Sequence, residues 1–555
     1  MSSSAPPHDA DVEDPDVIVV GHGPVGAALA LYLGRRGHRV VVLERRTGPY
    51  TLPRATSFDG ETARLLAATG VGGRLADVGE PATGYEWRNA AGRPLVRLAF
   101  ADPGRYGWPD ATTMHQPHLE AALHAQQREH PGLSVRHGHT VVGIADHSDR
   151  VEVTAALPDG TTEVLRGAWV VGCDGANSFV RKHLDPPGTD LGFSYDWLLC
   201  DVVPYGPVTF VPTNIQICDP VRPTTLVGSG HGRRRYEFMR LPGETAAELE
   251  RPETVWRLLA DHGVTPENAE LTRSAVYTFQ ASWAERWRSG RVLLAGDAAH
   301  LMPPFVGQGM CSGIRDAANL AWKLDAVLRG LAGERLLDTY PVERRRLAKE
   351  SIVASVKLGQ VICVTDPAAA ADRDASMLTG AENRPAAAPD PAESLPQGLL
   401  ARDAERRLAV GEVVPQGRVA RAGRVALFDE AVGTGLVLVA TADPRPALGA
   451  DRLAALDRWG CRLVHLLPAD GTATAEQPAP PAPPAQPAQV TQPTQVTQVT
   501  EVTDTDGVYH AWLAAAGAAA ALVRPDYHVF GAVASTAGLP GLVDEFLHRT
   551  HYRTQ

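Results

Sequence analysis

Three glycines follow the first apolar run of the chain at a spacing typical of a turn that holds a dinucleotide: Gly21, Gly23 and Gly26. A residue without a Cβ lets the backbone approach a pyrophosphate closely. Pro24 and Val25 open the next segment, and a helix beginning there would point its first N–H groups at the phosphates. Glu44 stands about twenty residues after the turn, where a carboxylate can accept hydrogen bonds from both ribose hydroxyls and would repel a 2′-phosphate. These residues predict FAD or NAD, rather than NADP, as the first cofactor.

A second group of residues that could do chemistry lies in the segment 291–313. Asp297 directly follows an apolar run and a glycine, so its carboxylate can accept hydrogen bonds from a polyol. The turn from Gly307 through Gly309 to Met310 opens a helix that is expected to run to residue 329. Backbone N–H groups at such a helix start stabilise negative charge, and a reduced flavin carries that charge at its N1 and C2 carbonyl edge. A glycine-rich turn with a helix cap and no ligand is the alternative.

The elements that must position these residues follow from the apolar pattern. Short apolar runs at 16–20 and 40–43 predict strands, and the pattern between them predicts a helix over 25–36. Two further strands, at 224–228 and 235–241, are expected in a mostly antiparallel sheet that lies over the cofactor.

Two stretches rich in Ala and Pro interrupt the pattern, at 366–396 and 477–505, and the composition of the second is typical of a disordered loop. Between them, residues 408–468 alternate short apolar strands with a helix that is expected over 446–460. The alanine-rich stretch 511–523 predicts a packed helix, too short to cross a hydrocarbon layer of about 30 Å. The region beyond residue 396 is therefore predicted to be a separate α/β domain with a flexible insertion.

The composition disfavours several classes of function. The 555 residues carry a formal net charge of -11 without a concentrated basic stripe, so nucleic acid is not expected as a partner. The stretch from Met1 to Asp16 lacks the basic start and apolar core of a secretory signal, which predicts a cytoplasmic protein without membrane association. The six cysteines lie far apart, with no Cys-x-x-Cys pair and no histidines at zinc-ligand spacing, so we expect reduced thiols and no metal.

Three motifs resemble, in order and spacing, the fingerprints of the class A flavoprotein aromatic hydroxylases: the glycine turn, Cys173-Asp174-Gly175 and Gly296-Asp297. Asp201 and the stretches 216–225 and 303–310 are more closely similar to 3-(3-hydroxyphenyl)propionate hydroxylases and to antibiotic-pathway (polyketide) hydroxylases. This resemblance covers residues from about 16 to 357.

Beyond that part, the patterns at 423–440 and 524–526 resemble the thioredoxin-like C-terminal domain that some members of the family carry. The tail has no Cys-x-x-Cys pair, so a redox relay through it is not expected.

The resemblance implies an α/β fold, in which a Rossmann-like FAD-binding domain carries an inserted, mostly antiparallel substrate-binding sheet and is followed by the thioredoxin-like domain. The implied boundaries are 14–192 for the first part of the FAD-binding domain, 193–287 for the sheet, 288–365 for the second part with a long helix, 366–396 for a linker, and 397–555 for the C-terminal domain with a disordered insertion at about 472–505.

In the chemistry of this family, NADPH or NADH reduces bound FAD, oxygen adds to the flavin C4a position, and the hydroperoxide transfers a hydroxyl group to an electron-rich ring. The resemblance therefore implies an NAD(P)H-dependent monooxygenase that acts on O2 and a small phenolic or polyketide-type aromatic. A flavin-dependent epoxidase or Baeyer–Villiger-type oxygenase on the same fold is one alternative. A redox-silent binding protein is another, and a homodimer stays open as the assembly.

The resemblance assigns a cofactor-binding role to the positions that match its motifs: Gly21, Gly23, Pro24, Val25, Gly26, Glu44, Arg45, Arg54, Gln116, Asp174, Asp297, Pro304, Gly307, Gly309 and Met310. Among them, Arg54 and Gln116 would reach the pyrophosphate and ribityl region. Asp174 would help to organise flavin and nicotinamide entry.

Three positions would act at the flavin ring in catalysis, Pro304 along its face and Gly309 and Met310 as backbone donors. Two residues depart from the family pattern, since His22 stands where a small residue is usual and Cys311 where a small polar residue is usual. Neither departure removes a backbone contact.

Five residues are candidates for the substrate pocket: Asp59, Gln216, Arg235, Tyr236 and Phe238. The alternatives are a core role for Tyr236 and Phe238, a solvated hairpin edge for Arg235 and a helix N-cap for Asp59.

Overall fold

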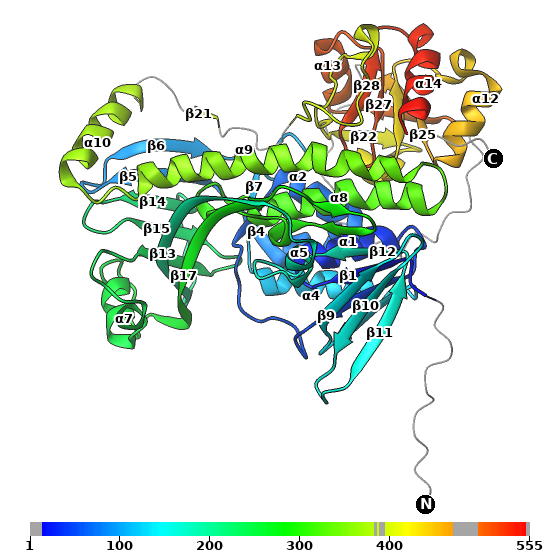
Figure 1. Ribbon diagram of the computed structural model, residues 1–555. Coiled ribbons are helices and arrows are strands. Elements are labelled where there is room, and N and C mark those ends of the chain that lie inside the picture. Colours follow the sequence, from blue (N-terminus) through cyan, green and yellow to red (C-terminus); the bar gives the residue numbers. More distant parts are fainter. Residues whose placement is uncertain (1–13, 382–385, 388–393, 470–497, 551–555) are drawn as a thin grey trace, which may run out of the picture.

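The computed structural model describes residues 14–381, 386–387, 394–469 and 498–550. Three large sheets organise them, of six, nine and seven strands (Figure 1). The first two sheets belong to the larger N-terminal part of the chain. The third forms the C-terminal domain, which sits beside the long helices α8 (Gly309–Leu328) and α9 (Thr339–Ile362).

The six-stranded sheet is built from short apolar strands. Its strands, in spatial order, are β18 (Arg288–Ser289), β19 (Val292–Leu294), β12 (Trp169–Gly172), β1 (Val17–Val20), β2 (Val40–Glu44) and β8 (Leu133–His137). All pairs except β18 with β19 are parallel, and unbroken Val-rich runs suit strands covered on both faces. The predicted strand, turn, helix and strand are confirmed, with α1 (Pro24–Gly34) as the helix.

The nine-stranded sheet is mostly antiparallel and draws on distant parts of the chain. In spatial order its strands are β20 (His300–Leu301), β17 (Ala269–Ala284), β13 (Gly188–Pro204), β16 (Arg234–Met239), β15 (Thr224–Gly228), β14 (Asn214–Cys218), β5 (Gly84–Asn89), β6 (Pro94–Ala99) and β21 (Ala386–Ala387). The expected strand at 224–228 is confirmed, and the one at 235–241 ends earlier, at Met239. The sheet is not confined to residues 193–287, because β5 pairs in parallel with β14.

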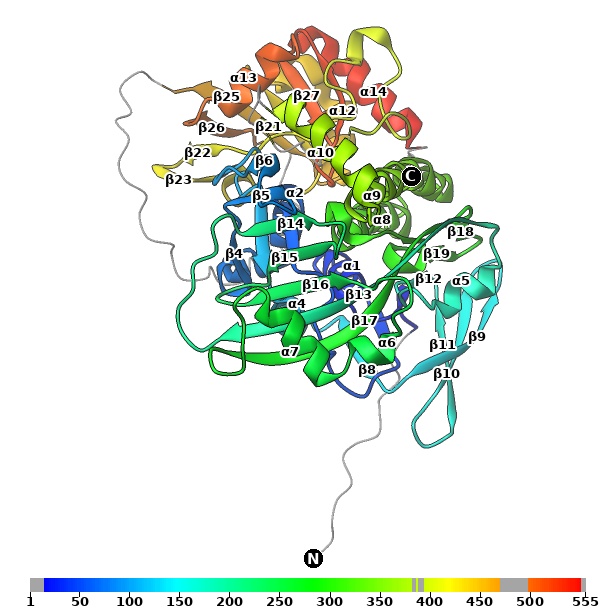
Figure 2. The same ribbon diagram turned by 90° about the vertical axis from the view of Figure 1, so that its left-hand side faces the viewer.

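Different helices cover the two faces of this sheet (Figures 1 and 2). On one face, α7 (Pro252–Ala260) follows the short α6 (Ala246–Leu249) and packs on apolar side chains of β13 and β16. On the other, α9 and α10 (Pro367–Ala381) pack against Trp87 and Leu199. The segment 366–396 was predicted to be a linker, which is wrong for its first half, because Met377 and Leu378 give α10 an apolar side that the sheet covers.

The C-terminal domain contains the seven-stranded sheet. Its strands, in spatial order, are β23 (Arg424–Leu427), β22 (Arg418–Arg421), β26 (Thr500–Asp504), β25 (Arg462–Pro468), β24 (Val437–Ala440), β27 (Ala520–Val523) and β28 (Val529–Val533). Its helices are α11 (Phe428–Val432), α12 (Arg445–Arg458), α13 (Val508–Ala515) and α14 (Leu539–Arg549).

Two sequence predictions for this domain need correction. The helix expected over 511–523 is in fact the end of α13 and the strand β27, because the turn at Gly517 ends the helix and the apolar run that follows pairs with β24. The insertion predicted at about 472–505 overlaps β26, which is an ordered strand paired with β25. The part of that prediction that covers 472–497 lies outside the described residues.

Buried ion pairs fix the C-terminal domain to the rest of the protein. The Arg524 guanidinium lies 2.7 Å from the Glu343 carboxylate of α9 and 2.6 Å from that of Asp526. The Lys323 ammonium of α8 lies 2.7 Å from Glu343 as well. Removal of one partner from such a buried network costs about 3–5 kcal/mol, so the two parts are expected to unfold together.

The remaining elements are short. They are the helices α2 (Gly60–Leu66), α3 (Leu75–Val78), α4 (Gln116–Gln127) and α5 (Phe179–Leu184), the small sheet of β3 (Ser57–Asp59), β7 (Ala111–Met114) and β4 (Gly79–Pro81), and the small sheet of β11 (Thr162–Gly167), β10 (Val151–Ala156) and β9 (Thr140–Asp146). Over the described ranges, no single helix is both long and apolar enough to span a membrane; the segments 334–362 and 367–378 reach that limit only as a pair bent by 114°.

Candidate active site

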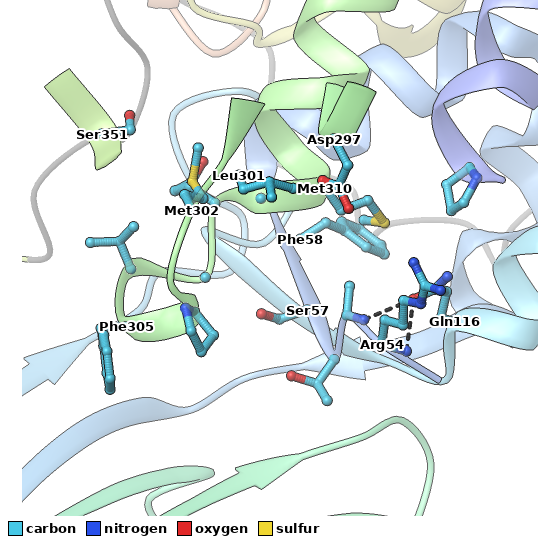
Figure 3. A pocket seen from close by; sticks show the side chains of 18 of the residues that line it. Arg54, Ser57, Phe58, Gln116, Asp297, Leu301, Met302, Phe305, Met310 and Ser351 are labelled. Atoms are coloured by element: carbon cyan, nitrogen blue, oxygen red, sulfur yellow. Dashed lines mark hydrogen bonds between the residues drawn. The ribbon is translucent and has the colours of Figure 1, made fainter. Parts of the chain in front are cut away.

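A cavity of about 1950 Å³ lies between the six-stranded sheet and one face of the nine-stranded sheet. We call this face, which carries Trp87 and Leu199, the inner face of that sheet. We call the part lined by the glycine turn, Arg54, Asp297 and the start of α8 the turn side. The sheet side is the part lined by β5, β14, β15, β16 and β17, by Phe305, and by α9 and α10. Figure 3 shows Asp297 and Met310 on the turn side near Arg54, with Met302 and Phe305 across the cavity. A typical small-molecule pocket holds about 300–1000 Å³, so there is room for a dinucleotide and a second molecule.

The three glycines of the turn are required for different reasons. Gly21 has a φ of +100°, and a Cβ there would lie 2.4 Å from the carbonyl oxygen of Cys173. A Cβ on Gly26 would lie 2.1 Å from the carbonyl oxygen of Gly21. Gly23, by contrast, would place a Cβ in open space, with nothing within 4 Å. Gly21 and Gly26 are therefore required for the turn itself, whereas Gly23 leaves space that a ligand can use.

Glu44 lies beside this turn at the end of β2. Its two carboxylate oxygens accept hydrogen bonds from the backbone N–H groups of His22 and Arg46, each at 2.9 Å. These bonds fix the carboxylate at the cavity wall, and each oxygen keeps a lone pair for a further donor. Arg45, the next residue, is exposed at the cavity.

A histidine cluster stands next to the turn, and sequence reasoning did not predict it. The ring of His22 stacks on that of His124 at 4.0 Å between centroids, and its Nε2 lies 2.7 Å from Gln127 Oε1. Burial lowers the pKa of His22, and it lowers the pKa of His124 to about 3. Both rings are therefore neutral near pH 7, and the only signal in the sequence was the unusual His22.

Gln116 holds the loop that carries Arg54. Its Oε1 accepts hydrogen bonds from the backbone N–H groups of Arg54 at 3.0 Å and Ala55 at 2.7 Å (Figure 3). Its Nε2 donates to Glu120 at 2.7 Å. The Gln116 amide therefore positions the loop, and the Arg54 side chain lines the cavity.

Asp297 follows β19 in a short 3-10 turn, Gly296–Ala298, that a buried carboxylate holds in place. Asp316 of α8 accepts hydrogen bonds from the Gly296 N–H at 3.1 Å and from the Arg344 Nε at 2.9 Å, and it lies 2.7 Å from His300 Nε2. The Asp297 carboxyl itself faces the cavity, and burial raises its pKa. The turn therefore presents an acceptor to any ligand hydroxyl in the cavity.

The start of α8 also faces the cavity. Pro304–Val306 forms a 3-10 turn that ends at Gly307, with a φ of +66°, and the cavity is lined by Gly309 and Met310. The first N–H groups of a helix have no intrahelical acceptor, so this terminus can stabilise negative charge. Cys311, which follows, is buried, and burial raises the pKa of its thiol to about 12; it is an inert packing group.

Asp174 organises its own turn. Its carboxylate accepts hydrogen bonds from the Ser178 hydroxyl and from the backbone N–H groups of Phe179 at 2.7 Å and Val180 at 3.2 Å. It therefore caps the start of α5, from which Arg181 donates to the carbonyl of Asp297 at 3.2 Å.

The five substrate candidates separate into two groups. Asp59, Gln216 and Arg235 line the cavity. Tyr236 and Phe238 do not, because successive residues of β16 alternate between faces and these two pack against α7. Their placement in the pocket was wrong, and the alternative core role holds.

Arg235 and Asp59 line the cavity but are engaged with protein groups. Arg235 pairs with Asp201 at 2.7 Å and donates to the carbonyls of Arg54 at 2.6 Å and Pro53 at 2.8 Å. Asp59 caps α2 through the Thr62 N–H and pairs with Arg315 at 2.8 Å. Burial opposes ionisation of Asp59, but the Arg315 charge holds its pKa below the ordinary value.

Several lining residues of the sheet side were not predicted from the sequence. They are mostly aromatic or apolar: Tyr85, Trp87, Phe279, Phe305, Leu358 and Met377. Charged side chains also line this side, among them Glu237, Arg273 and Arg373. Alternation along the predicted strand would have placed Glu237 on the face opposite Tyr236.

Comparisons with known proteins agree along nearly the whole chain. Residues 14–355 match a family described as FAD binding domain, and residues 411–549 match one described as HcaD C-terminal domain. A probable NADH-specific resorcinol 4-hydroxylase of Rhodococcus jostii (strain RHA1) is 40% identical over 99% of this chain and 97% of its own. A 3-(3-hydroxy-phenyl)propionate/3-hydroxycinnamic acid hydroxylase of Mycobacterium sp. (strain JLS) is 37% identical over 83% of this chain and 82% of its own.

Among solved structures, the ternary complex of aklavinone-11 hydroxylase with FAD and aklavinone is similar with a TM-score of 0.72 and 25% identity. It covers 97% of this chain and 100% of its own.

Proposed function

Because the chain belongs to the FAD-binding aromatic hydroxylases and is an NAD(P)H-dependent flavoprotein monooxygenase, we propose that it hydroxylates a small phenol bound on the sheet side of the cavity. The observation that carries this proposal is the continuity of the cavity from the open space at Gly23, past the start of α8, to the aromatic wall at Trp87. One space thus offers both a dinucleotide cradle and an apolar pocket beside it.

FAD fits the turn side. Gly23 leaves room for a pyrophosphate, Glu44 can accept from ribose hydroxyls, and Asp297 can accept from a ribityl chain. Arg54 and Arg45, which line the cavity, would supply positive charge near the phosphates. Bound FAD supplies the activation of O2 and the transfer of one oxygen atom to the ring.

The protein's own groups would act in three ways. The N–H groups of Gly309 and Met310 would hold negative charge on the reduced ring, and Pro304 would lie along its face. Phe305 and Trp87 would exclude water, which would otherwise favour loss of the bound oxygen as peroxide. Gln116 and Asp174 would position the loops around the cofactor.

The nicotinamide donor is proposed to be NADH, because the Rhodococcus relative, with 40% identity over nearly the full length, is named as NADH-specific.

The C-terminal domain is proposed to be thioredoxin-like in topology and structural in role. In support, β24 and β25 are parallel, β27 and β28 form an antiparallel pair beside β24, and α14 follows. The domain has a single cysteine, Cys461, which is buried and whose thiol pKa burial raises to about 12. It is therefore unsuited to a redox relay.

We also propose a revised domain division. Residues from 14 to about 365 contain both the FAD-binding part and the substrate sheet. Within that range, β5 and β6 are assigned to the substrate sheet. α10 is then the cover of that sheet rather than a linker.

The test is a turnover assay with FAD-loaded protein. Purified protein should consume NADH faster when a phenol such as resorcinol or 3-(3-hydroxyphenyl)propionate is added, and mass spectrometry should find a product with one added oxygen atom. NADH consumption that no phenol stimulates, or that yields only hydrogen peroxide, would contradict the proposal.

A further inference from the structure

A polar row crosses the inner face of the nine-stranded sheet. Gln216 of β14 pairs with Thr225 of β15, and Thr225 pairs with Glu237 of β16. The row is flanked by Trp87 opposite Gln216 and by Leu199 opposite Glu237. All five side chains line the cavity, so three polar side chains lie here between two apolar ones.

Two members of the row satisfy each other. The Thr225 hydroxyl donates to Gln216 Oε1 at 2.6 Å, and Gln216 Nε2 donates to the carbonyl of Thr224 at 3.0 Å. Neither group needs a ligand to complete its hydrogen bonds.

Glu237 is different, because its carboxyl group receives no hydrogen bond from any residue that the structure describes. Glu237 is only 9% exposed, and its nearest cationic group is Arg235 Nη1 at 3.9 Å. That guanidinium is already bound to Asp201 and to the carbonyls of Pro53 and Arg54. A buried carboxyl group without a donor is costly, and burial raises the pKa of Glu237 to about 7.

Two arginines near the sheet are held by protein acceptors. Arg273 donates through its two terminal nitrogens to the Pro53 carbonyl and to the Tyr277 hydroxyl, while its buried Nε has no hydrogen-bond partner among the described residues. Arg373 of α10 donates to the Cys218 carbonyl at 2.6 Å and pairs with Asp374 at 2.8 Å. A substrate carboxylate placed against the polar row would meet the carboxyl group of Glu237.

We propose that Glu237 recognises the substrate by accepting a hydrogen bond from a ring hydroxyl, and that it selects neutral, polyhydroxylated aromatic rings over rings that carry a carboxylate. This inference rests on the proposed function and makes it more specific. The inference distinguishes the substrates named for the two kinds of relative. Resorcinol is a neutral diphenol, whereas 3-(3-hydroxyphenyl)propionate is an anion at neutral pH. Glu237 is thus a specificity residue that touches the substrate.

The test compares Kd, from the change in flavin absorbance on ligand addition, with KM and kcat, for resorcinol and for 3-(3-hydroxyphenyl)propionate. The FAD-loaded proteins are the wild type, Glu237→Gln and Glu237→Leu. Tyr236→Phe is the matched control, because it alters the neighbouring residue on the opposite face of β16. FAD content and thermal unfolding show that each variant is folded, and the conservative Gln variant keeps the test valid if Leu is not tolerated.

The wild type is expected to bind resorcinol at least about tenfold more tightly than the carboxylate. Glu237→Leu should raise the Kd and KM for resorcinol about tenfold with a smaller change in kcat, and Glu237→Gln should lower the Kd for the carboxylate. Tyr236→Phe should change neither.

Unchanged Kd values in both Glu237 variants, tighter wild-type binding of the carboxylate, or binding of neither compound would overturn the inference. Failure of the proposed function has a different signature, because both ligands could then bind as expected without stimulating NADH consumption.

Discussion

The two sides of the cavity are built in different ways. The turn side uses backbone groups and residues that directly end strands, such as the glycine turn, Glu44 after β2 and Asp297 after β19. The sheet side uses side chains from strands and a helix that lie far apart in the sequence, from Trp87 of β5 to Met377 of α10. The difference indicates that cofactor binding depends on short contiguous motifs, whereas substrate selection depends on the register between distant strands.

The largest expected effect is the loss of FAD in Gly23→Val. The new side chain meets no protein atom near its Cβ, so it would fill only the space left for the cofactor. FAD occupancy should fall below about a tenth, while the thermal unfolding of the apoprotein stays close to that of the wild type. Gly26→Val is the contrasting variant, since its Cβ would lie 2.1 Å from the Gly21 carbonyl oxygen and should unfold the turn. A Gly23→Val protein that keeps its FAD would contradict the different roles assigned to Gly23 and Gly26.

Arg235→Met should weaken the contact between the two sides, because Arg235 on the sheet donates to the carbonyls of Pro53 and Arg54 in the loop that lines the turn side. Removal of the guanidinium leaves the buried Asp201 carboxylate poorly paired, which costs about 3–5 kcal/mol. Urea unfolding measures this loss, and FAD affinity should fall with it. Arg166→Met removes an exposed pair with Glu152, and solvent screening should make its cost much smaller. Equal, small losses of stability in both variants would show that the contact of Arg235 with Pro53 and Arg54 is unimportant for stability.

Glu237→Gln should change the pH dependence of stability in the substrate-free protein. Because burial raises the pKa of this carboxyl group from 4.5 to about 7, the native state binds the proton more tightly than the unfolded chain. The wild type should therefore lose stability relative to the variant as pH rises from about 5 to 8, by up to about 3 kcal/mol. Thermal unfolding of both proteins at several pH values measures this difference in stability.

The matched control is Glu253→Gln, at an exposed site in the first turn of α7, which should leave the profile unchanged. A difference in stability between the wild type and Glu237→Gln that stays constant over this pH range would contradict the buried, unpaired state of Glu237.

Asp297→Ala should have the smallest effect, because it removes one acceptor on the turn side and leaves the backbone cradle. The Kd for FAD is expected to rise about tenfold to thirtyfold, on the order of 1.5–2 kcal/mol. The apoprotein should be at least as stable as the wild type, since burial disfavours the ionised Asp297 carboxylate and raises its pKa. Titration of the apoprotein with FAD measures the Kd, with Asp297→Asn as the conservative control. An unchanged Kd would remove Asp297 from the cofactor site.

The turn side was predictable from the sequence because its geometry is local. The strand, glycine turn and helix at residues 17–34 are contiguous, and the comparisons confirm the family, FAD as the cofactor and monooxygenase chemistry. What the local motif could not reveal is the unequal role of its glycines, because the atoms near Gly21 include the carbonyl of Cys173, which directly follows β12 about 150 residues away.

The sheet side required the tertiary structure. The predicted strand around Arg235 was correct in place, but the choice of Tyr236 and Phe238 over Glu237 was wrong, because an alternating pattern does not say which face meets α7 and which meets the cavity. The composition of 367–381 is typical of a linker, and only its packing on Trp87 and its neighbours makes α10 part of the pocket. The sequence by itself determined the cofactor and the class of reaction, through backbone geometry encoded in short motifs. Which side chains face the substrate was decided by pairings between segments that are distant in the chain.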